Sequence, residues 1–245
     1  RQINELKKIN KNKYLIDIFV HSNIPIERDD VTTILHKEPP VNGWNWLPWE
    51  NRKTIYLNKE NYDLFLYTEN DHLYTEKHLD SFLEITKVLP ENLIAGFIQF
   101  EEFPQYDAGK FYPAYHATYE WDFNSVEKIG NYIIACFGNQ HHAGFLLTKK
   151  QLNNVLEKMG DGFLVDEKRG ITMVGLPGYD SPKVRCCTDV YTHGGMKKVI
   201  PISHFNDFLI HHMPNKYYGI FKNYSFDKTR MQPALEKMLM KIENK

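Results

Sequence analysis

The chain has 245 residues, of which 42% are hydrophobic and 25% are charged, a composition typical of a folded domain with its own core. Its 30 Lys and Arg residues and 31 Asp and Glu residues give a formal net charge of −1, which argues against a protein that binds polyanions such as nucleic acid. The three cysteines, Cys136, Cys186 and Cys187, are too few for a disulfide framework, and we expect them to be free thiols.

No apolar run reaches the roughly 20 residues that a membrane-spanning helix needs, and the first residues lack the apolar segment of a signal peptide. We therefore expect one soluble domain over residues 1–245, with residues 1–13 as an N-terminal extension and residues 218–245 as a helical tail. The chain begins with Arg1 rather than Met, which is compatible with a lost upstream anchor. The cytoplasm and the Golgi lumen therefore both stay open as locations.

The first predicted strand is the apolar run over residues 14–20, which has the length of a buried parallel strand. Polar residues and Pro25 follow it, and open α/β sheets bind their ligands at such strand ends. The loop over residues 36–49 then carries Trp44, Trp46 and Trp49. These rings suit stacking on sugars or bases, and for any one of them a place in the core beneath the loop is at least as good an explanation.

A helix over residues 49–61 leads into a second buried strand over residues 62–67, which stops directly before the acids Glu69 and Asp71. The remaining pattern predicts helices over residues 75–90, 148–159 and 186–191, strands over residues 93–100, 131–137, 143–147 and 197–202, and a mobile loop over residues 160–183.

Strands that alternate with helices indicate a single α/β domain whose central sheet is mostly parallel and whose C-terminal part is mixed. Neither G-x-G-x-x-G nor G-x-x-x-x-G-K-[ST] occurs in the chain, so the usual dinucleotide and P-loop phosphate cradles are missing. Any phosphate must be held in another way.

Glu69 and Asp71 are two positions apart, so in extended geometry both side chains point the same way and can share one cation. Carboxylate oxygens suit Mg²⁺ or Mn²⁺, which complete their coordination with substrate phosphates and water. Acids in a turn are more often solvated surface, but the buried strand before them favours the metal site. Asn70, between the two acids, is grouped with the donor-binding candidates.

Three histidines, His204, His211 and His212, lie close together near the C-terminus, and neutral imidazole is a good ligand for ions such as Mn²⁺. Any single one of them is more often a histidine bonded to the backbone. We favour His212 as the ligand that completes the metal site. A separate polar cluster over residues 139–144 fits either a polyhydroxylated ligand or a polar hairpin turn, and the sequence does not separate the two.

Arg52, on the helix before the metal strand, can contact phosphate oxygens through its guanidinium group, although exposed basic residues on helices are commoner than phosphate ligands. The carboxylates available as a catalytic base are Glu101, Glu102, Asp122 and Asp189. The sequence does not rank them by distance, and Glu101 and Asp189 are our candidate catalytic residues.

Residues 62–71 read Tyr-Asp-Leu-Phe-Leu-Tyr-Thr-Glu-Asn-Asp, which resembles the strand-and-acid motif of GT-A type nucleotide-sugar glycosyltransferases, where the pattern is D-x-D or a close variant. Here the first acid is Glu69. The likeness extends to a little-characterised group of glycosyltransferases through residues 96–101, 199–203 and 211–217. The ordered set covers most of the chain and is more specific than any single member.

The resemblance implies a single GT-A-like, Rossmann-like domain that uses Mn²⁺ or Mg²⁺ and a nucleotide-sugar donor. It places His21 and Asn23 against the nucleotide and Arg52 against the diphosphate. Glu69, Asp71 and His212 would hold the metal. For Glu101 the resemblance favours a contact with the acceptor or the donor sugar over the role of a base.

We expect a metal-dependent glycosyltransferase that moves a sugar from a nucleoside-diphosphate donor to a hydroxyl of a glycan or glycoconjugate, with inversion favoured at the anomeric carbon. The region over residues 160–183 would then act as a lid. A metal-dependent phosphoesterase is the rival enzyme, and it needs a second set of acidic and histidine ligands. A carbohydrate-binding module that uses the Trp44 to Trp49 rings is the non-enzymatic rival.

Overall fold

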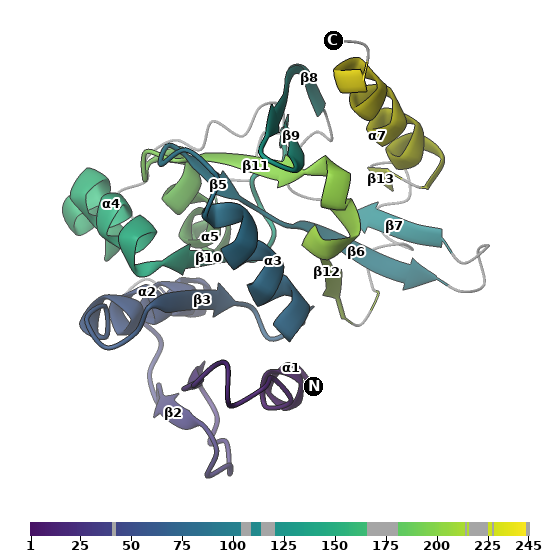
Figure 1. Ribbon diagram of the computed structural model, residues 1–245. Helices are drawn as coiled ribbons and strands as arrows, with labels where there is room; N and C mark the ends of the chain where they lie inside the picture. The colour runs from purple at the N-terminus through teal and green to yellow at the C-terminus, as the bar shows by residue number, and fades with distance from the viewer. Residues whose placement is uncertain are drawn as a thin grey trace.

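The computed structural model describes residues 1–40, 43–103, 109–113, 121–165, 181–213, 215, 225–226 and 228–243. The chain is a mixed α/β protein in which helices surround several small sheets (Figure 1). None of the described helices combines the length and the apolar character needed to cross a membrane.

The described strands form four sheets. The largest has the order β13 (Ser225–Phe226), β7 (Gly109–Pro113), β6 (Ile98–Phe103), β12 (Leu209–His212) and β4 (His72–Leu73). A second has the order β5 (Leu93–Ala95), β11 (Lys197–Pro201), β9 (Tyr132–Phe137) and β8 (Trp121–Ile129). The two-stranded sheets are β10 (Gly144–Thr148) with β3 (Leu64–Thr68), and β1 (Phe19–Ser22) with β2 (Thr32–Leu35).

A mostly parallel central sheet was expected, and this expectation is wrong for the described strands. Only the pairs β1–β2, β5–β11 and β6–β12 are parallel. The other pairings are antiparallel, and two of them, β6–β7 and β8–β9, join strands that follow each other directly in the chain. Between β8 and β9 the chain turns through Gly130, whose φ of 57° is easily adopted without a Cβ. Short connections of this kind impose antiparallel pairing.

Two stretches of chain pass from one of the larger sheets to the other. The apolar run over residues 93–100 is divided at Gly96 and Phe97, so that β5 lies in the four-stranded sheet and β6 in the five-stranded sheet. The 3-10 helix η3 (Ile202–Phe208) likewise joins β11 to β12. These two crossings carry β6 and β12 side by side into the sheet that holds the site described below.

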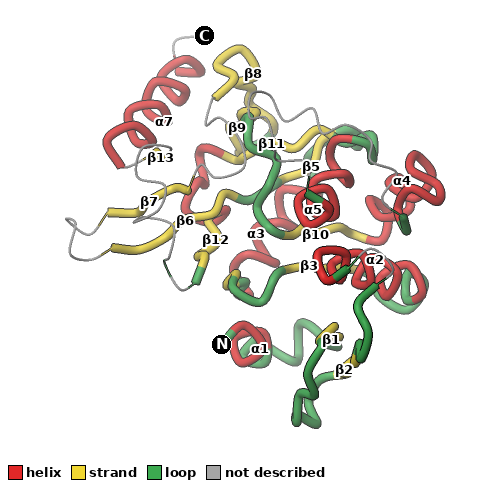
Figure 2. Tube along the Cα trace, turned by 180° about the vertical axis from the view of Figure 1, so that it is seen from behind, coloured by secondary structure: helices red, strands yellow, loops and turns green. Residues whose placement is uncertain are grey.

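The predicted helices are present. They are α2 (Leu47–Leu57), α3 (Glu76–Thr86), α4 (Lys149–Met159), α5 (Pro182–Thr192) and α7 (Lys228–Glu243), with a short α1 (Gln2–Leu6) in the N-terminal extension. The helix α3 begins with a cap, because Thr75 and His78 satisfy each other's backbone groups in a capping box. Figure 2 shows α4 and α7 at opposite sides of the molecule and α5 among the strands, where its residues Val184 to Tyr191 are buried.

The remaining segments differ from the sequence pattern in two places. Residues 14–18 have no regular structure, and the strand expected over residues 14–20 is reduced to β1, which pairs with β2 alone. The loop expected over residues 160–183 begins with the 3-10 helix η2 (Gly160–Phe163) and ends at α5. Its centre, residues 166–180, lies outside the described residues, and so does any test of the lid.

Candidate metal centre

Three neighbouring strands of the five-stranded sheet bring His72, Glu101 and His212 together from distant parts of the chain. In the antiparallel pair β4–β12, His72 lies opposite His212. In the parallel pair β6–β12, His211 is in register with Phe100, so Glu101 comes next to His212. Side chains at paired positions point to the same face of a sheet, and these three therefore form one row.

Asp71 completes the group from the turn that precedes β4. Its Oδ1 atom lies 2.8 Å from Nδ1 of His72, and its Oδ2 atom lies 3.3 Å from Nε2 of His212. The two imidazole rings are 5.0 Å apart between centroids. One ligand atom from each of Asp71, His72 and His212 falls within 4.8 Å of the other two.

Backbone hydrogen bonds fix the turn that carries Asp71. After β3 the amide of Glu69 still donates to the carbonyl of Ala143, at 3.1 Å, but the chain then reverses and the amide of His72 donates to the carbonyl of Glu69, at 3.4 Å. The amide of Met213, directly after β12, donates to the carbonyl of Asp71 at 2.6 Å. The acid turn is thus tied to the strand that carries His212.

A second layer of buried side chains orients the two imidazoles. Oε1 of Glu101, which is 0% exposed, lies 2.7 Å from Nδ1 of His212. A carboxylate in this position holds the proton on Nδ1 and turns Nε2 toward Asp71 and any ion bound there, as is usual behind metal-bound histidines. The side-chain amide nitrogen of Gln99 lies 2.6 Å from Nε2 of His72 and holds that ring from the side opposite to Asp71.

The electrostatics of the group favour a charged carboxylate. Burial opposes the ionisation of Asp71, but hydrogen bonds from His212 and His72 outweigh it and hold the pKa of Asp71 well below its usual range. Burial also opposes protonation of His212, and the hydrogen bonds to Asp71 and Glu101 overcome this, so the pKa of His212 is raised. Without a cation, a protonated His212 between the carboxyl groups of Asp71 and Glu101 offsets part of their negative charge.

The donor set fits a divalent cation. It offers one carboxylate and two imidazoles whose ligand atoms are close enough to surround a single ion, at the roughly 2.0–2.2 Å that such ligands keep from Mn²⁺-like or Zn²⁺-like ions. Two imidazoles suit Mn²⁺ better than Mg²⁺, which prefers oxygen ligands. The side chain of Asp71 is 24% exposed, while His72 and His212 are at most 2% exposed, so an ion would enter on the Asp71 side.

Of the predicted metal ligands, the structure brings Asp71 and His212 together but leaves Glu69 outside the group. The extended geometry expected between Glu69 and Asp71 is absent, because the chain turns at residues 70–71 and the exposed Asn70 lies in that turn. Burial raises the pKa of Cys187, and the negative charge of Glu69 adds to this shift. Glu69 thus lies close enough to Cys187 of α5 for its charge to act on that thiol.

Arg52 and Asp189 lie together inside the protein rather than in the candidate metal centre. Nη1 of Arg52 is 3.7 Å from Oδ2 of Asp189, and the two side chains are 0% and 4% exposed. The guanidinium group is held between the rings of Trp49 and Phe163, each 4.4 Å from its central carbon to the ring centroid. A group with no exposed surface does not offer its charge to a diphosphate, so the expected phosphate contact of Arg52 is not supported by its position.

His21 and Asn23, the expected nucleotide contacts, lie at the end of β1. Nδ1 of His21 is 2.9 Å from Nε2 of His36, and its Nε2 atom is 2.9 Å from the hydroxyl of Thr54 on α2. Burial, and then the neighbouring His36, lower the pKa of His21 to about 4, so the ring is neutral near pH 7. Asn23 is exposed. Neither residue belongs to the group around Asp71.

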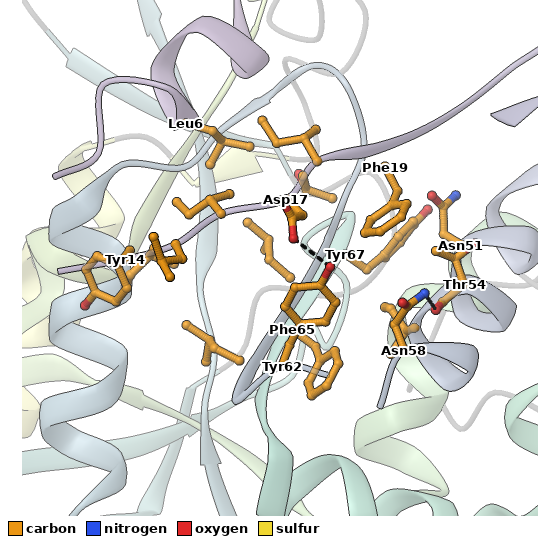
Figure 3. A pocket seen from close by; sticks show the side chains of 18 residues that line it. Leu6, Tyr14, Asp17, Phe19, Asn51, Thr54, Asn58, Tyr62, Phe65 and Tyr67 are labelled. Carbon is orange, nitrogen blue, oxygen red and sulfur yellow. Dashed lines mark hydrogen bonds between the residues drawn. The ribbon is translucent and has the colours of Figure 1, made fainter. Parts of the chain in front are cut away.

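A cavity of about 220 Å³ separates residues 14–19 from β3 (Figure 3). Consecutive residues of both segments line it, so it runs between the edge of β3 and the chain that was expected to form the first strand of the sheet. Figure 3 shows the hydroxyl of Tyr62 pointing to Asp17, to which it donates at 2.7 Å. The cavity wall otherwise is mostly apolar and includes none of the metal-centre residues.

The polar segment over residues 139–144 is not a hairpin turn, because β9 and β10 on either side of it belong to different sheets. Lys198 holds this segment in place: its Nζ atom lies 3.1 Å from the carbonyl of Gln140 and 3.0 Å from Nδ1 of His142. Burial lowers the pKa of Lys198 to about 7. With His142 0% exposed and Lys198 2% exposed, this cluster is buried structure.

The remaining histidine and tryptophan candidates are separate from the metal centre. The ring of His204 packs on Tyr132 at 4.7 Å between centroids. Of the three clustered tryptophans, Trp44 is 41% exposed and Trp49 is 3% exposed. The indole N–H of Trp49 donates to the carbonyl of Pro182 at 2.9 Å, so this ring belongs to the core.

Sequence reasoning missed two residues of the centre, His72 and Gln99. His72 follows Asp71 directly, and a histidine next to an acid at a strand end is a signal that the sequence does carry. Gln99 lies two positions before Glu101, on the same face of β6, and becomes meaningful only when the pairing of β6 with β12 is known.

None of the known protein families, curated proteins or solved structures with which the chain was compared matches it.

Proposed function

We propose that Asp71, His72 and His212 bind a divalent cation such as Mn²⁺, an ion that accepts imidazole as well as carboxylate ligands. The contact between Glu101 and His212 supports this more than any other observation. A buried carboxylate behind one nitrogen of a histidine, with a second carboxylate in front of the other nitrogen, is the arrangement that metal-bound histidines share.

We infer that the chain uses this cation as a glycosyltransferase, moving a sugar from a nucleoside-diphosphate donor to a hydroxyl of a glycan or glycoconjugate. A bound cation would neutralise the charge that develops on the leaving diphosphate. The acid turn directly after β3 and the late histidine beside it support this proposal. They leave the donor sugar and the acceptor open.

In this proposal the residues of the chain have distinct tasks. Asp71 and the two histidines hold the cation, while Glu101 orients His212 and keeps it in the tautomer that presents Nε2. Glu101 is therefore a positioning residue, since its carboxylate has no exposed surface for contact with an acceptor hydroxyl. The exposed Asn70 stays a candidate for contact with the donor.

A metal-dependent phosphoesterase is the second candidate, because two imidazoles and a carboxylate also form hydrolytic single-metal sites. A two-metal hydrolase would need another set of ligands. Within the described ranges, Asp71, His72 and His212 are the only group of three or more acids, histidines or cysteines close enough to hold an ion. This favours the transferase over a two-metal phosphoesterase.

A thermal-shift experiment separates these functions. The chain is melted with UDP, GDP or CMP, each with Mn²⁺ or with EDTA, because a ligand that binds the folded state raises its melting temperature. We expect one nucleoside diphosphate to raise the melting temperature only when Mn²⁺ is present. If no nucleotide has an effect and phosphoesters are hydrolysed, the chain is a phosphoesterase.

The matched variants for this experiment are Asp71→Asn and Asp63→Asn. Both remove one carboxylate near β3, but Asp63 is exposed and lies outside the metal centre. Asp71→Asn is expected to abolish the Mn²⁺-dependent shift and Asp63→Asn to keep it. Equal shifts in the two variants would remove Asp71 from the site.

A further inference from the structure

The side chain of Asn215 lies at the place where β12 ends and the chain leaves the sheet. Its Oδ1 atom accepts a hydrogen bond from the backbone amide of Glu102 at 3.2 Å and lies 2.9 Å from Nε2 of His211. It therefore connects the strand that carries Glu101 with the strand that carries His212. None of these contacts was expected from the sequence.

The side chain of Asn215 replaces a backbone hydrogen-bond acceptor at the end of β12. The parallel ladder between β12 and β6 ends at the pair of His211 with Phe100, whereas β6 continues to Phe103. The amide of Glu102 lies beyond the end of that ladder. It donates to the side-chain oxygen of Asn215 instead of to a backbone carbonyl. A short polar side chain can substitute for backbone in this way at strand ends and turns.

The backbone of Asn215 is adapted to this position. Its φ is 63°, in the left-handed region that glycine adopts freely and that Asn tolerates better than most residues. Its amide donates to the carbonyl of His212 at 3.4 Å. This turn directs the side chain of Asn215 toward the backbone of Glu102 in β6.

The contacts of Asn215 lie on the face of the sheet opposite to the metal centre. His211 stacks on Phe100, with ring centroids 5.2 Å apart and planes inclined by 22°, while His212 and Glu101 point to the other face. One face therefore holds the two strands together, and the other face carries the contact between Glu101 and His212.

We propose that Asn215 is a positioning residue that clamps β12 to β6 and so fixes the distance between His212 and Glu101. This rests on the proposed metal centre. Without the side-chain oxygen, the end of β12 loses its link to Glu102, and the imidazole of His212 is no longer held in the orientation that presents Nε2. Loss of a group that orients a metal ligand typically weakens metal binding about 10- to 100-fold.

Two substitutions separate the side chain from the backbone. Asn215→Gly keeps the left-handed conformation and removes the acceptor, whereas Asn215→Asp keeps the acceptor and nearly the same shape. The affinity for Mn²⁺ alone is measured by electron paramagnetic resonance, together with the melting temperature of each variant. We expect affinity to fall about 10- to 100-fold in Asn215→Gly, in a protein that still unfolds in one cooperative transition, and to stay near the wild-type value in Asn215→Asp.

A second measurement without metal makes the clamp testable even if the metal centre fails. Long-range ¹H–¹⁵N spectra, recorded at an alkaline pH where the ring of His212 is neutral, report which imidazole nitrogen carries the proton. The clamp predicts a proton held on Nδ1 in the wild type and in Asn215→Asp but not in Asn215→Gly. Wild-type protein that binds no Mn²⁺ would overturn the metal centre alone. Equal affinities and equal His212 spectra in the wild type and Asn215→Gly, or equal losses in both variants, would overturn the clamp.

Discussion

Two groups in this protein each pair an Asp carboxylate with a buried basic side chain, but they differ in their access to solvent. Arg52 and Asp189 face each other between α2 and α5, and neither side chain is more than 4% exposed. Asp71 and His212 also pair, but the Asp71 side chain is 24% exposed. The first group is closed to solvent and the second is open on one side.

The chemical nature of the groups reinforces this difference. A guanidinium group has only donors and stays protonated, so Arg52 can neutralise Asp189 but cannot bind a metal. The imidazoles of His72 and His212 carry lone pairs, and each has its second nitrogen occupied by a buried partner. Burial of charge alone therefore does not identify a functional site in this chain; open access and available lone pairs do.

We expect the largest loss of stability from a substitution in the closed pair of Arg52 and Asp189. Asp189→Asn leaves the guanidinium of Arg52 buried next to a neutral amide, and removal of one member of a buried ion pair typically costs about 3–5 kcal/mol. Denaturant unfolding should show this loss, while the fraction that stays folded binds Mn²⁺ as the wild type does. A loss below about 1 kcal/mol would mean that this pair is not structural.

Gly96→Ala tests the packing around a third buried basic residue, Lys198, which like Arg52 is enclosed inside the protein. A Cβ at Gly96 would lie 2.1 Å from Cε of Lys198, whose amine is fixed by the segment over residues 139–142. Overpacking of this kind costs about 1–3 kcal/mol in the free energy of unfolding. The double variant with Lys198→Met should recover part of the cost of Gly96→Ala, measured as a double-mutant cycle, and fully additive losses would contradict this contact.

Asp71→Asn tests the open group and should show the reverse balance of effects. In the absence of metal we expect a loss of about 1–2 kcal/mol, because hydrogen bonds to a charged partner are exchanged for weaker ones on a side chain that water partly reaches. Mn²⁺ binding should be lost, as measured by isothermal titration calorimetry. Loss of several kcal/mol together with retained Mn²⁺ binding would make Asp71 a structural acid like Asp189.

The smallest expected effect is the pH dependence that Asp71 and His212 add to the metal-free protein. The pKa of Asp71 is lowered by folding, so its contribution is present above its unfolded pKa of about 4 and is lost as the pH falls through the folded value. The pKa of His212 is raised, so its contribution is complete below about pH 6.5 and is lost as the pH rises through the folded value.

This pair therefore contributes most between about pH 4 and pH 6.5. The difference in unfolding free energy between the wild type and Asp71→Asn should be largest in this window and should shrink above it. The same raised pKa makes Mn²⁺ compete with a proton on His212, so Mn²⁺ affinity should rise with pH. A difference that stays constant from acid to mildly alkaline pH would show that the two residues are not coupled.

Local sequence signals predicted the parts of the fold that depend on nearby residues. The capped start of α3 at Thr75, the helix α4 after Thr148 and the strand β3 before the acid turn are all readable from spacing and capping residues. The proximity of Asp71 to His212 also followed from the sequence, through the resemblance and the donor chemistry of the two side chains.

The rest depends on contacts between distant segments. The pairing of β12 with both β4 and β6 decides that His72 and Gln99 join the centre, and no local pattern reveals that pairing. Arg52 was expected to contact the diphosphate, but residues far along the chain, Phe163 and Asp189, enclose it. The turn at residues 70–71 separates Glu69 from Asp71, although their spacing suggested a shared direction.

The most direct test of the metal centre is X-ray absorption spectroscopy of the protein loaded with one equivalent of Mn²⁺. The fine structure distinguishes imidazole from oxygen ligands, and His72 and His212 predict two imidazoles around the ion together with oxygen from Asp71. A first shell made of oxygen alone, or failure of the protein to retain Mn²⁺, would contradict the account.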